Sequence, residues 1–260
     1  MKVRATLLFA AAAVLINEGR GQYSTGFESP AFISGEIAGQ DSWTINQNPG
    51  TSRVLTNSEI ATELTNAGLT PGQTVHGGAQ ALLVSGSGLS NATVRTMPGL
   101  EAQPIIRLDV WTRPLLAGST GAALGNIFLT IEDSIGTRAA AFRFGTAFGQ
   151  TIDYGTNVAG VWQPTSILWD TDTWYRLTLD VDYFAKTYNM AVNGTLVNSS
   201  PIPFYTATST SFSQVRIFRG ANQAGMITDD LSVSAVPEPT CAGLVLVGAL
   251  GVCLPRRRSR

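Results

Sequence analysis

The stretch Trp174-Tyr-Arg-Leu-Thr-Leu-Asp-Val-Asp182, followed by Thr187-Tyr-Asn-Met-Ala-Val-Asn-Gly194, decides the fold. Apolar side chains alternate with polar ones along its first half, and this period of two is typical of a strand with one buried face. The Asn193-Gly194 pair is the strongest short-range signal of a tight hairpin turn. The sequence therefore predicts a strand over residues 174–181, a second strand over 187–192, and a turn that leads into a third at 195–198.

The same alternation recurs through the middle of the chain. Two further segments place apolar side chains on one face and mostly polar or aromatic ones on the other: Ile106, Leu108 and Val110 against Arg107, Asp109 and Trp111, and Ile127, Leu129 and Ile131 against Phe128, Thr130 and Glu132. Six more segments are expected to be strands, over residues 79–85, 92–97, 138–144, 160–169, 214–219 and 226–234. Short strands separated by Gly-rich turns favour an all-β fold, an antiparallel two-sheet β-sandwich of the jelly-roll type.

One short helix is expected over residues 58–65. Its capping is predicted to be poor, because Ala61 stands where a capping box would need Glu.

Composition limits the class of protein. Only 13% of the residues are charged and the net charge is −1, so the chain offers no basic field for nucleic acid. The two cysteines, Cys241 and Cys253, lie close to the C-terminus, so the expected sandwich carries no disulfide. Its stability is expected to come from packing, and residues 22–235 are enough for one ordinary core.

The N-terminus has the pattern of a secretory signal. Lys2 and Arg4 precede an apolar run over residues 5–16, and the small residues Gly19 and Gly21 allow cleavage before Gln22. Residues 1–21 are therefore predicted to be a signal peptide with a helical apolar region, and residues 22–235 the exported domain.

The C-terminal segment, residues 236–260, joins three ordered parts: the triplet Pro237-Glu238-Pro239, an apolar run over 241–254, and the arginines Arg256, Arg257, Arg258 and Arg260. This combination resembles the PEP-CTERM sorting signal of bacterial exported proteins. The resemblance implies recognition by an exosortase-type processing enzyme. Fourteen residues of helix reach only about 21 Å, short of the roughly 30 Å hydrocarbon core. We expect a C-terminal membrane helix that anchors the protein transiently in the inner membrane, with its arginines cytoplasmic, before it reaches the cell envelope or the extracellular space.

A second resemblance covers most of the exported domain. The segment that runs from Trp174 through Lys186-Thr-Tyr-Asn189 to Val192-Asn-Gly194 looks like the strand-hairpin-strand of concanavalin A-like (laminin G-like) jelly rolls, and residues 227–233 look like their last strand. The opening Gly26-Phe-Glu-Ser-Pro30, with Trp43, resembles the start of sandwich domains that precede PEP-CTERM tails. The resemblance implies the fold. It leaves function open, because such sandwiches host lectins, glycosidases, lyases and adhesion modules.

The sequence shows no catalytic constellation. Glucanases of this fold carry a Glu-x-Asp-x-Glu strand, whereas Glu132-Asp133 lacks that spacing and is expected to be a solvated strand end. Gln73-Thr-Val-His76 and residues 183–189 resemble the motifs of jelly-roll alginate lyases only loosely. The extra residue between Gln73 and His76 would place them on opposite faces of a strand. His76 is therefore expected to be an exposed loop histidine.

No cofactor and no zinc site are expected, since no cluster of Cys or His exists. Calcium stays open, because hard oxygen ligands are present at Asp153, at Asp170 with Asp172, and at Asp229 with Asp230, although without a closed ligand spacing.

A sheet face is the remaining route to function. Four tryptophans could stack on sugar rings, although aromatic strand residues are more often core: Trp111, Trp162, Trp169 and Trp174. Arg107, Asp109 and Trp111 share one strand face and form the candidate ligand-binding surface. We expect an exported, exosortase-sorted surface or extracellular matrix protein with a non-catalytic sandwich, and exopolysaccharide as the ligand to look for. The alternative is a polysaccharide-degrading enzyme, a lyase or a glycoside hydrolase, on the same fold.

Overall fold

The computed structural model describes residues 22–47, 51–85, 90–115, 127–146, 149–157, 161–220 and 225–236. The predicted signal peptide and the sorting segment with Pro237, Glu238, Pro239 and its arginines lie outside these ranges. Within them, no helix has the length and apolar character needed to cross a membrane.

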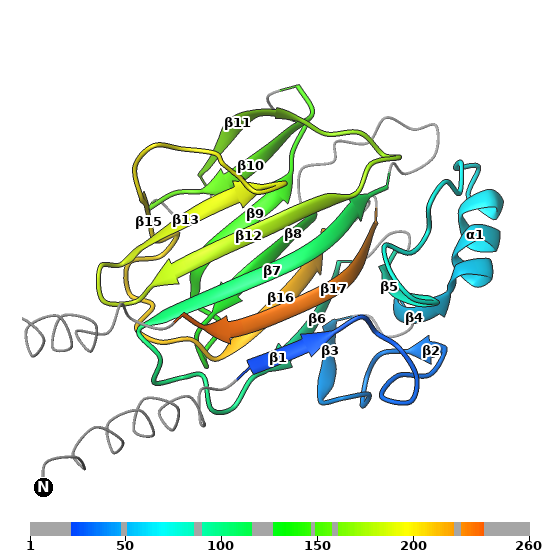
Figure 1. The fold of residues 1–260 in the computed structure, drawn as a ribbon, viewed down its shortest axis with the longest axis horizontal. Helices are drawn as coiled ribbons and strands as arrows, with labels where there is room; N and C mark the ends of the chain where they lie inside the picture. Colours follow the sequence, from blue (N-terminus) through cyan, green and yellow to red (C-terminus); the bar gives the residue numbers. More distant parts are fainter. Residues whose placement is uncertain are drawn as a thin grey trace, which may run out of the picture.

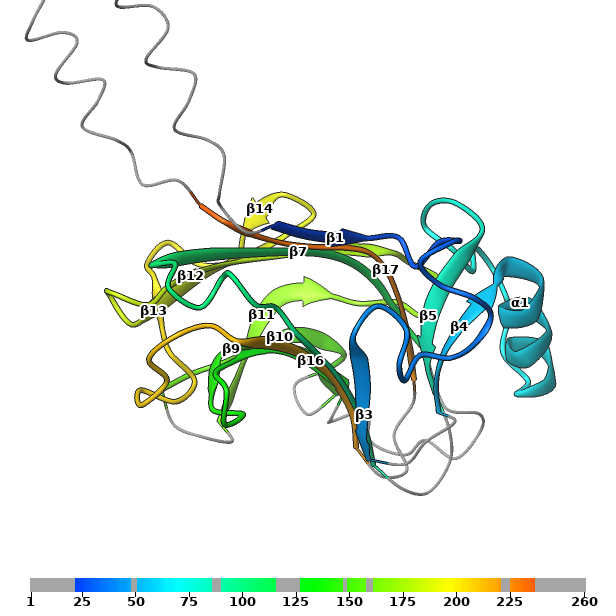
Figure 2. The ribbon, with the colours of Figure 1, turned by 90° about the horizontal axis from the view of Figure 1, so that it is seen from below.

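Two antiparallel sheets face each other as the layers of a sandwich (Figures 1 and 2). The ten-stranded sheet has the order β14-β13-β12-β7-β17-β5-β4-β2, with β1 beside β17 and β15 beside β13. The seven-stranded sheet has the order β11-β10-β9-β8-β16-β6-β3. The predicted all-β sandwich is thus confirmed for the described residues.

The ten-stranded sheet contains β1 Gln22–Thr25, β2 Gly35–Glu36, β4 Ser52–Thr56, β5 Gln80–Val84, β7 Ile105–Pro114, β12 Tyr175–Asp182, β13 Thr187–Val192, β14 Thr195–Leu196, β15 Ile202–Pro203 and β17 Met226–Ala235. The seven-stranded sheet contains β3 Trp43–Gln47, β6 Asn91–Thr96, β8 Ile127–Glu132, β9 Arg138–Phe144, β10 Thr151–Gly155, β11 Trp162–Leu168 and β16 Gln214–Arg219.

The core lies between the two sheets and is built by the predicted alternation. Along β12, Leu177 and Leu179 point inward and are fully buried, as are Leu129 on β8 and Ile217 on β16 from the opposite layer. Each buried aliphatic side chain of this size contributes roughly 1.5–3 kcal/mol relative to an exposed one. This is how the domain can fold without a disulfide.

The β12–β13 hairpin joins the two strands that the sequence predicts over residues 174–181 and 187–192. Asp182 pairs with Thr187, and Leu177 pairs with Val192 at the other end. The turn beyond β13 places Asn193 at φ 50° and Gly194 at φ 81°, the left-handed conformations that an Asn-Gly turn requires. The chain then returns as the short strand β14 beside β13.

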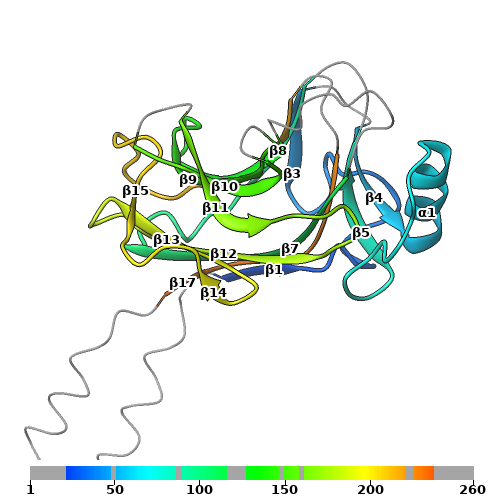
Figure 3. The same cartoon turned by 90° about the horizontal axis from the view of Figure 1, so that it is seen from above.

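The helix α1, Asn57–Asn66, is better capped than predicted. Its N-cap is Thr56 and not Ser58, so the third helical residue is Glu59 and both bonds of a capping box form. The expectation of a poor cap was wrong because it placed the helix start too late. The helix packs beside β4 and β5 (Figure 3). Its buried Ile60 and Leu64 form, with Leu83 and neighbours, a second apolar cluster outside the main core.

Candidate functional site

The three residues of the predicted binding surface lie on the outer face of the ten-stranded sheet, opposite the core. Arg107, Asp109 and Trp111 stand directly across from Asp180, Thr178 and Arg176 of β12, which confirms their shared face. Arg107 donates two hydrogen bonds to Asp180, at 2.6 and 2.8 Å. These bonds raise the pKa of the Arg107 guanidinium.

Asp109 is equally engaged. Arg176 donates to it from Nε at 2.9 Å and from Nη2 at 2.8 Å, and the Thr178 hydroxyl donates at 3.0 Å. The outer face of β7 and β12 therefore carries ion pairs that satisfy one another. Ligand binding there stays a prediction.

Trp111 is covered by a loop histidine. The imidazole of His76 stacks on its indole at 3.8 Å between ring centroids with 15° between planes, and meets Trp174 edge-on at 5.7 Å. His76 Nδ1 lies 2.7 Å from Oδ2 of Asp230. His76 is in a loop, as expected, but its ring is held on two sides and is only partly exposed. Sequence reasoning missed this arrangement because Asp230 lies 154 residues further along the chain.

A buried carboxylate holds the same loop. Asp229 is fully buried and accepts the backbone N–H groups of His76 at 2.9 Å, Gly77 at 3.1 Å and Asp230 at 2.8 Å. Burial raises the pKa of Asp229 to about 6. The charge of Asp230 also raises this pKa, whereas the three backbone N–H donors lower it. The register of β17 with β7 shifts between Asp229 and Ser232, so these two aspartates sit at a bulge.

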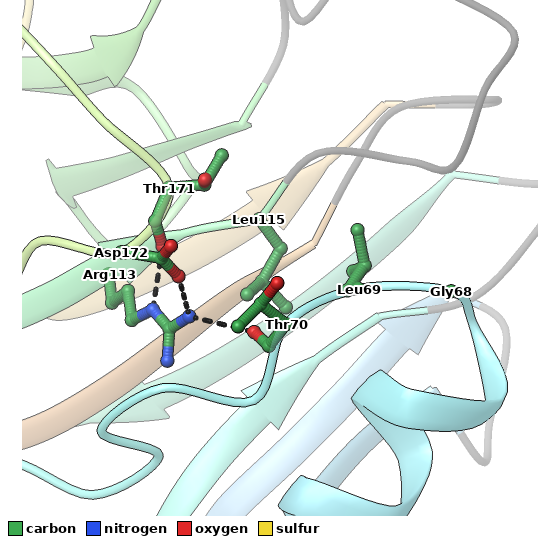
Figure 4. Close-up of a pocket in the computed structure, with 7 residues that line it drawn as sticks. All are labelled: Gly68, Leu69, Thr70, Arg113, Leu115, Thr171 and Asp172. Atoms are coloured by element: carbon green, nitrogen blue, oxygen red, sulfur yellow. Dashed lines mark hydrogen bonds and ion pairs between the residues drawn. The ribbon is translucent and has the colours of Figure 1, made fainter.

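Arg113 ties two loops to the end of β7 (Figure 4). Its guanidinium, nearly fully buried, donates to the carbonyls of Thr171 at 2.6 Å and Gln73 at 2.8 Å and to Asp172 at 2.7 Å. Burial lowers the pKa of Arg113. A cavity of about 180 Å³ adjoins it, lined also by Leu69 and Leu115. Since these donors already have acceptors, we assign Arg113 a structural role.

The outer face of the seven-stranded sheet holds a second set of charges that the sequence did not reveal. Glu132 is fully buried and accepts from Arg216 Nε, Gln214 Nε2 and Thr130 Oγ1, each at 2.9 Å. Arg138 Nε approaches the same carboxylate at 3.5 Å. The expectation of a solvated strand end at Glu132 was wrong, because β9 and β16 place cationic and amide side chains beside it.

Arg143 has a matching partner on the neighbouring strand. It stands opposite Asp153, which is fully buried, and donates to it from Nε at 2.9 Å. Thr151 donates to the same carboxylate at 2.6 Å. The guanidinium carbon of Arg143 lies 4.6 Å from the centre of the Trp162 ring, within the range of a cation–π contact.

Aromatic rings connect these arginines. Phe128 and Phe218 stack at 4.5 Å, and Trp162 lies 5.9 Å from Phe128 and 5.7 Å from Tyr205. Arg138 lies 4.7 Å from the Phe128 ring centre. We call this set the arginine–aromatic face; its members are Phe128, Arg138, Arg143, Trp162, Tyr205, Arg216 and Phe218. The sequence did not reveal this face, because it predicts which residues alternate within each strand but not which strands lie side by side.

The residues that resemble lyase motifs do not meet in a site. Tyr183 and Tyr188 are buried between the sheets, and burial raises the pKa of both hydroxyls. Tyr188 donates to the carbonyl of Gly155 at 2.5 Å. Gln73 lies in a loop and its amide contacts the carbonyl of His76 at 3.4 Å. These groups therefore do not present a proton donor and acceptor to a common ligand.

The aspartates considered for calcium have other partners. Asp153 pairs with Arg143, Asp172 pairs with Arg113, and Asp229 accepts backbone donors. Within the described ranges, no three residues of the His, Cys, Asp and Glu types are grouped so as to hold a metal ion. Calcium binding stays a prediction.

The two packed antiparallel sheets define a jelly-roll β-sandwich, a fold that the chain shares with carbohydrate-active proteins. A carbohydrate esterase from Shiga toxin-encoding bacteriophage phi24B matches 82% of this chain and 97% of its own, with 13% identity and a TM-score of 0.55. An alginate lyase in complex with an alginate trisaccharide matches 84% of this chain and 100% of its own, with 14% identity and a TM-score of 0.51.

A sialidase also matches, with 11% identity and a TM-score of 0.53 over 83% of this chain. The match spans only 18% of the sialidase's length. No protein-family model matches the sequence, and neither does any curated protein. At these identities the likeness shows the fold alone.

Proposed function

We propose that the protein is an exported surface or extracellular matrix protein whose sandwich binds an acidic polysaccharide without cleaving it. The observation that carries the proposal is the arginine–aromatic face, where three guanidinium groups lie among four aromatic rings on the outer side of the seven-stranded sheet, and where Trp162 and Phe218 are the partly exposed rings. The exported domain would hold the ligand through this face rather than through Arg107, Asp109 and Trp111, because it combines guanidinium groups with several aromatic rings, whereas Trp111 is covered by His76.

The chemistry of this face fits a chain of acidic sugars. Guanidinium groups bind carboxylates in a planar, two-pronged geometry, and aromatic faces pack against the apolar faces of sugar rings. Arg138 and Arg216 keep 29% and 19% of their side chains exposed, and the buried Glu132 fixes their direction. A ligand carboxylate would meet cations that are already oriented, which reduces the entropy lost on binding.

The state of the carboxylates supports a non-catalytic role. Both Glu132 and Asp153 are fully buried and hydrogen-bonded to arginines. A general acid or base has to come within hydrogen-bond reach of the substrate. On this face, the two carboxylates act as supports for the cations.

The cellular location of the protein is the second part of the proposal. The signal-like residues 1–21 support export, and the resemblance of residues 236–260 to a PEP-CTERM tail supports an exosortase-type enzyme as partner. The protein would be held in the inner membrane during processing and then pass to the cell envelope or the extracellular space.

A polysaccharide-degrading enzyme is the alternative, and the His76–Asp230 pair favours it. A histidine held by a carboxylate beside Trp111 and Trp174 is the type of group that transfers protons in catalysis. Two of the structural neighbours, an esterase and a lyase, are enzymes that act on carbohydrates.

One experiment separates the two. The full chain, purified in mild detergent, is applied to immobilised acidic and neutral polysaccharides, with and without calcium. We expect retention on acidic polymers alone, release by salt, and an unchanged polymer. New reducing ends or unsaturated uronates would support the enzyme, and equal passage over every polymer would leave the binding role without a basis.

A further inference from the structure

Three strands of the ten-stranded sheet end side by side at one end of the sandwich. Ile105, the first residue of β7, stands opposite Asp182, the last residue of β12, and accepts the backbone N–H of Val236 at 2.9 Å. The β12–β13 hairpin and the end of β17 therefore lie together (Figure 1). Strands are spaced about 4.8 Å apart, so Val236 leaves the domain roughly two strand widths from the hairpin.

Two large apolar side chains project from this end. Among the described residues, Phe184 and Ile135 are the most exposed large hydrophobics, at 93% and 86%. Phe184 is at the tip of the β12–β13 hairpin, and Ile135 is in the turn between β8 and β9. The 203–206 segment joins the two tips, since Phe204 N–H donates to Lys186 O and Thr206 N–H to Arg138 O, each at 3.0 Å.

The hairpin holds Phe184 outward. Asp182 Oδ1 accepts the N–H groups of Phe184 at 2.9 Å and Ala185 at 2.8 Å, which fixes the turn. The preceding ring, Tyr183, packs inward against Phe204 at 5.3 Å between ring centroids. With its neighbours bound to the domain, Phe184 is presented to solvent by a defined turn.

The tail limits how far this end can lie from a membrane. Four residues, Pro237 to Thr240, separate Val236 from the apolar run that begins at Cys241. Five steps of a fully extended chain span at most about 18 Å. Once that run is inserted, Val236, at the end of the sandwich that carries Phe184, must stay within that distance of the lipid.

We propose that this end of the sandwich docks on the lipid surface and that Phe184 inserts into the interface between headgroups and acyl chains. The inference rests on the membrane anchoring by residues 236–260 proposed above. Aromatic rings favour this region of a bilayer. A contact that is weak by itself suffices, because a short tether keeps the hairpin at a local concentration in the millimolar range. Both sheet faces then stand away from the membrane and stay accessible to a polymer.

The test uses the full chain in vesicles of phosphatidylethanolamine and phosphatidylglycerol. Cys241 and Cys253 are changed to serine, and an environment-sensitive fluorophore is attached to Phe184→Cys. The matched control is Ile33→Cys, which replaces a side chain exposed at 68% in the segment that leads into β2. We expect a blue shift and quenching by brominated acyl chains for the label at 184, and neither for the label at 33.

Vesicle flotation separately measures whether the chain is attached to the membrane. Flotation without quenching at 184 overturns the inference but agrees with the proposed membrane anchoring. Absence of flotation overturns both the anchoring and the inference. A shift at 184 that needs raised protein concentration and no lipid shows that a second copy covers Phe184, which also overturns the inference.

Discussion

The imidazole of His76 lies flat on the indole of Trp111, with 3.8 Å between ring centroids, while the backbone N–H of His76 donates to the buried Asp229. One loop residue thus connects a partly buried aromatic side chain of β7 with a carboxylate buried at the bulge of β17. Because burial raises the pKa of Asp229 to about 6, we expect the attachment of this loop to depend on pH.

The Asp229 carboxyl should make the domain less stable as pH rises from about 4 to 6. Its pKa is near 3.8 when unfolded and about 6 when folded, so in this window the folded state binds more protons than the unfolded state. The difference between these two pKa values corresponds to about 3 kcal/mol. Urea unfolding at pH 4 and at pH 6.5 measures the larger part of this difference. The Asp229→Asn variant should lose less stability between these two pH values, and equal losses would contradict the assignment.

The Glu132→Ala substitution should be strongly destabilising. It leaves Arg216 and Arg138 without their shared buried partner, which typically costs about 3 kcal/mol or more. Denaturant unfolding measures the loss. Asp180→Ala is the matched control, since Asp180 pairs with the half-exposed Arg107 and should cost less than about 1 kcal/mol. Similar losses in both variants would mean that Glu132 is not the centre of a network.

Removal of a ring or a charge from the arginine–aromatic face should weaken binding of acidic polysaccharide. We expect Trp162→Ala and Arg216→Gln each to reduce affinity about tenfold, equivalent to roughly 1.4 kcal/mol. Only the arginine variant should also reduce the dependence on salt. Binding titrations at two ionic strengths measure both effects. Arg107→Gln, on the other sheet, should bind as the unmodified chain does, and a loss there would move the site to the ten-stranded sheet.

The capping box of α1 gives a prediction about stability alone. Thr56→Ala removes the side chain that caps the helix at Glu59 and should cost about 1 kcal/mol. Thr62→Ala, on an exposed helix position, should be neutral or slightly stabilising, because alanine is the better helix former. Thermal unfolding of both variants, read by circular dichroism, tests the pair. Equal melting temperatures would show that the cap contributes nothing measurable.

Strands with a long alternating pattern could be predicted from the sequence. The segments 187–192, 138–144 and 214–219 have the predicted limits. Residues 187–192 alternate between buried and half-buried positions, as the pattern predicts, whereas 138–144 is buried on both faces. The short β1, β2, β3, β4, β10 and β15 were not predicted. In β1, Gln-Tyr-Ser-Thr carries one large apolar residue, and its partner β17 lies at the other end of the chain.

The candidate site was harder to predict, for a physical reason. Alternation correctly placed Arg107, Asp109 and Trp111 on one face. It could not show that Arg216, 84 residues beyond Glu132, lies beside that carboxylate, or that Asp230 lies beside His76. Burial of a charge depends on which strands become neighbours, and that choice follows from the packing of the whole sandwich.

The pairing of β17 has a mechanical consequence. β17 runs between β7 on one side and β5 and β1 on the other, and Gln22 is paired with Ser234 close to its end. A pull on the tail acts along β17, whereas the hydrogen bonds of antiparallel strands run across it. The bonds of the ladder therefore share the load in shear and do not open one after another. If the domain is anchored at its C-terminus while a sheet face binds a polymer, the force passes through β17, which is paired with β7, β5 and β1.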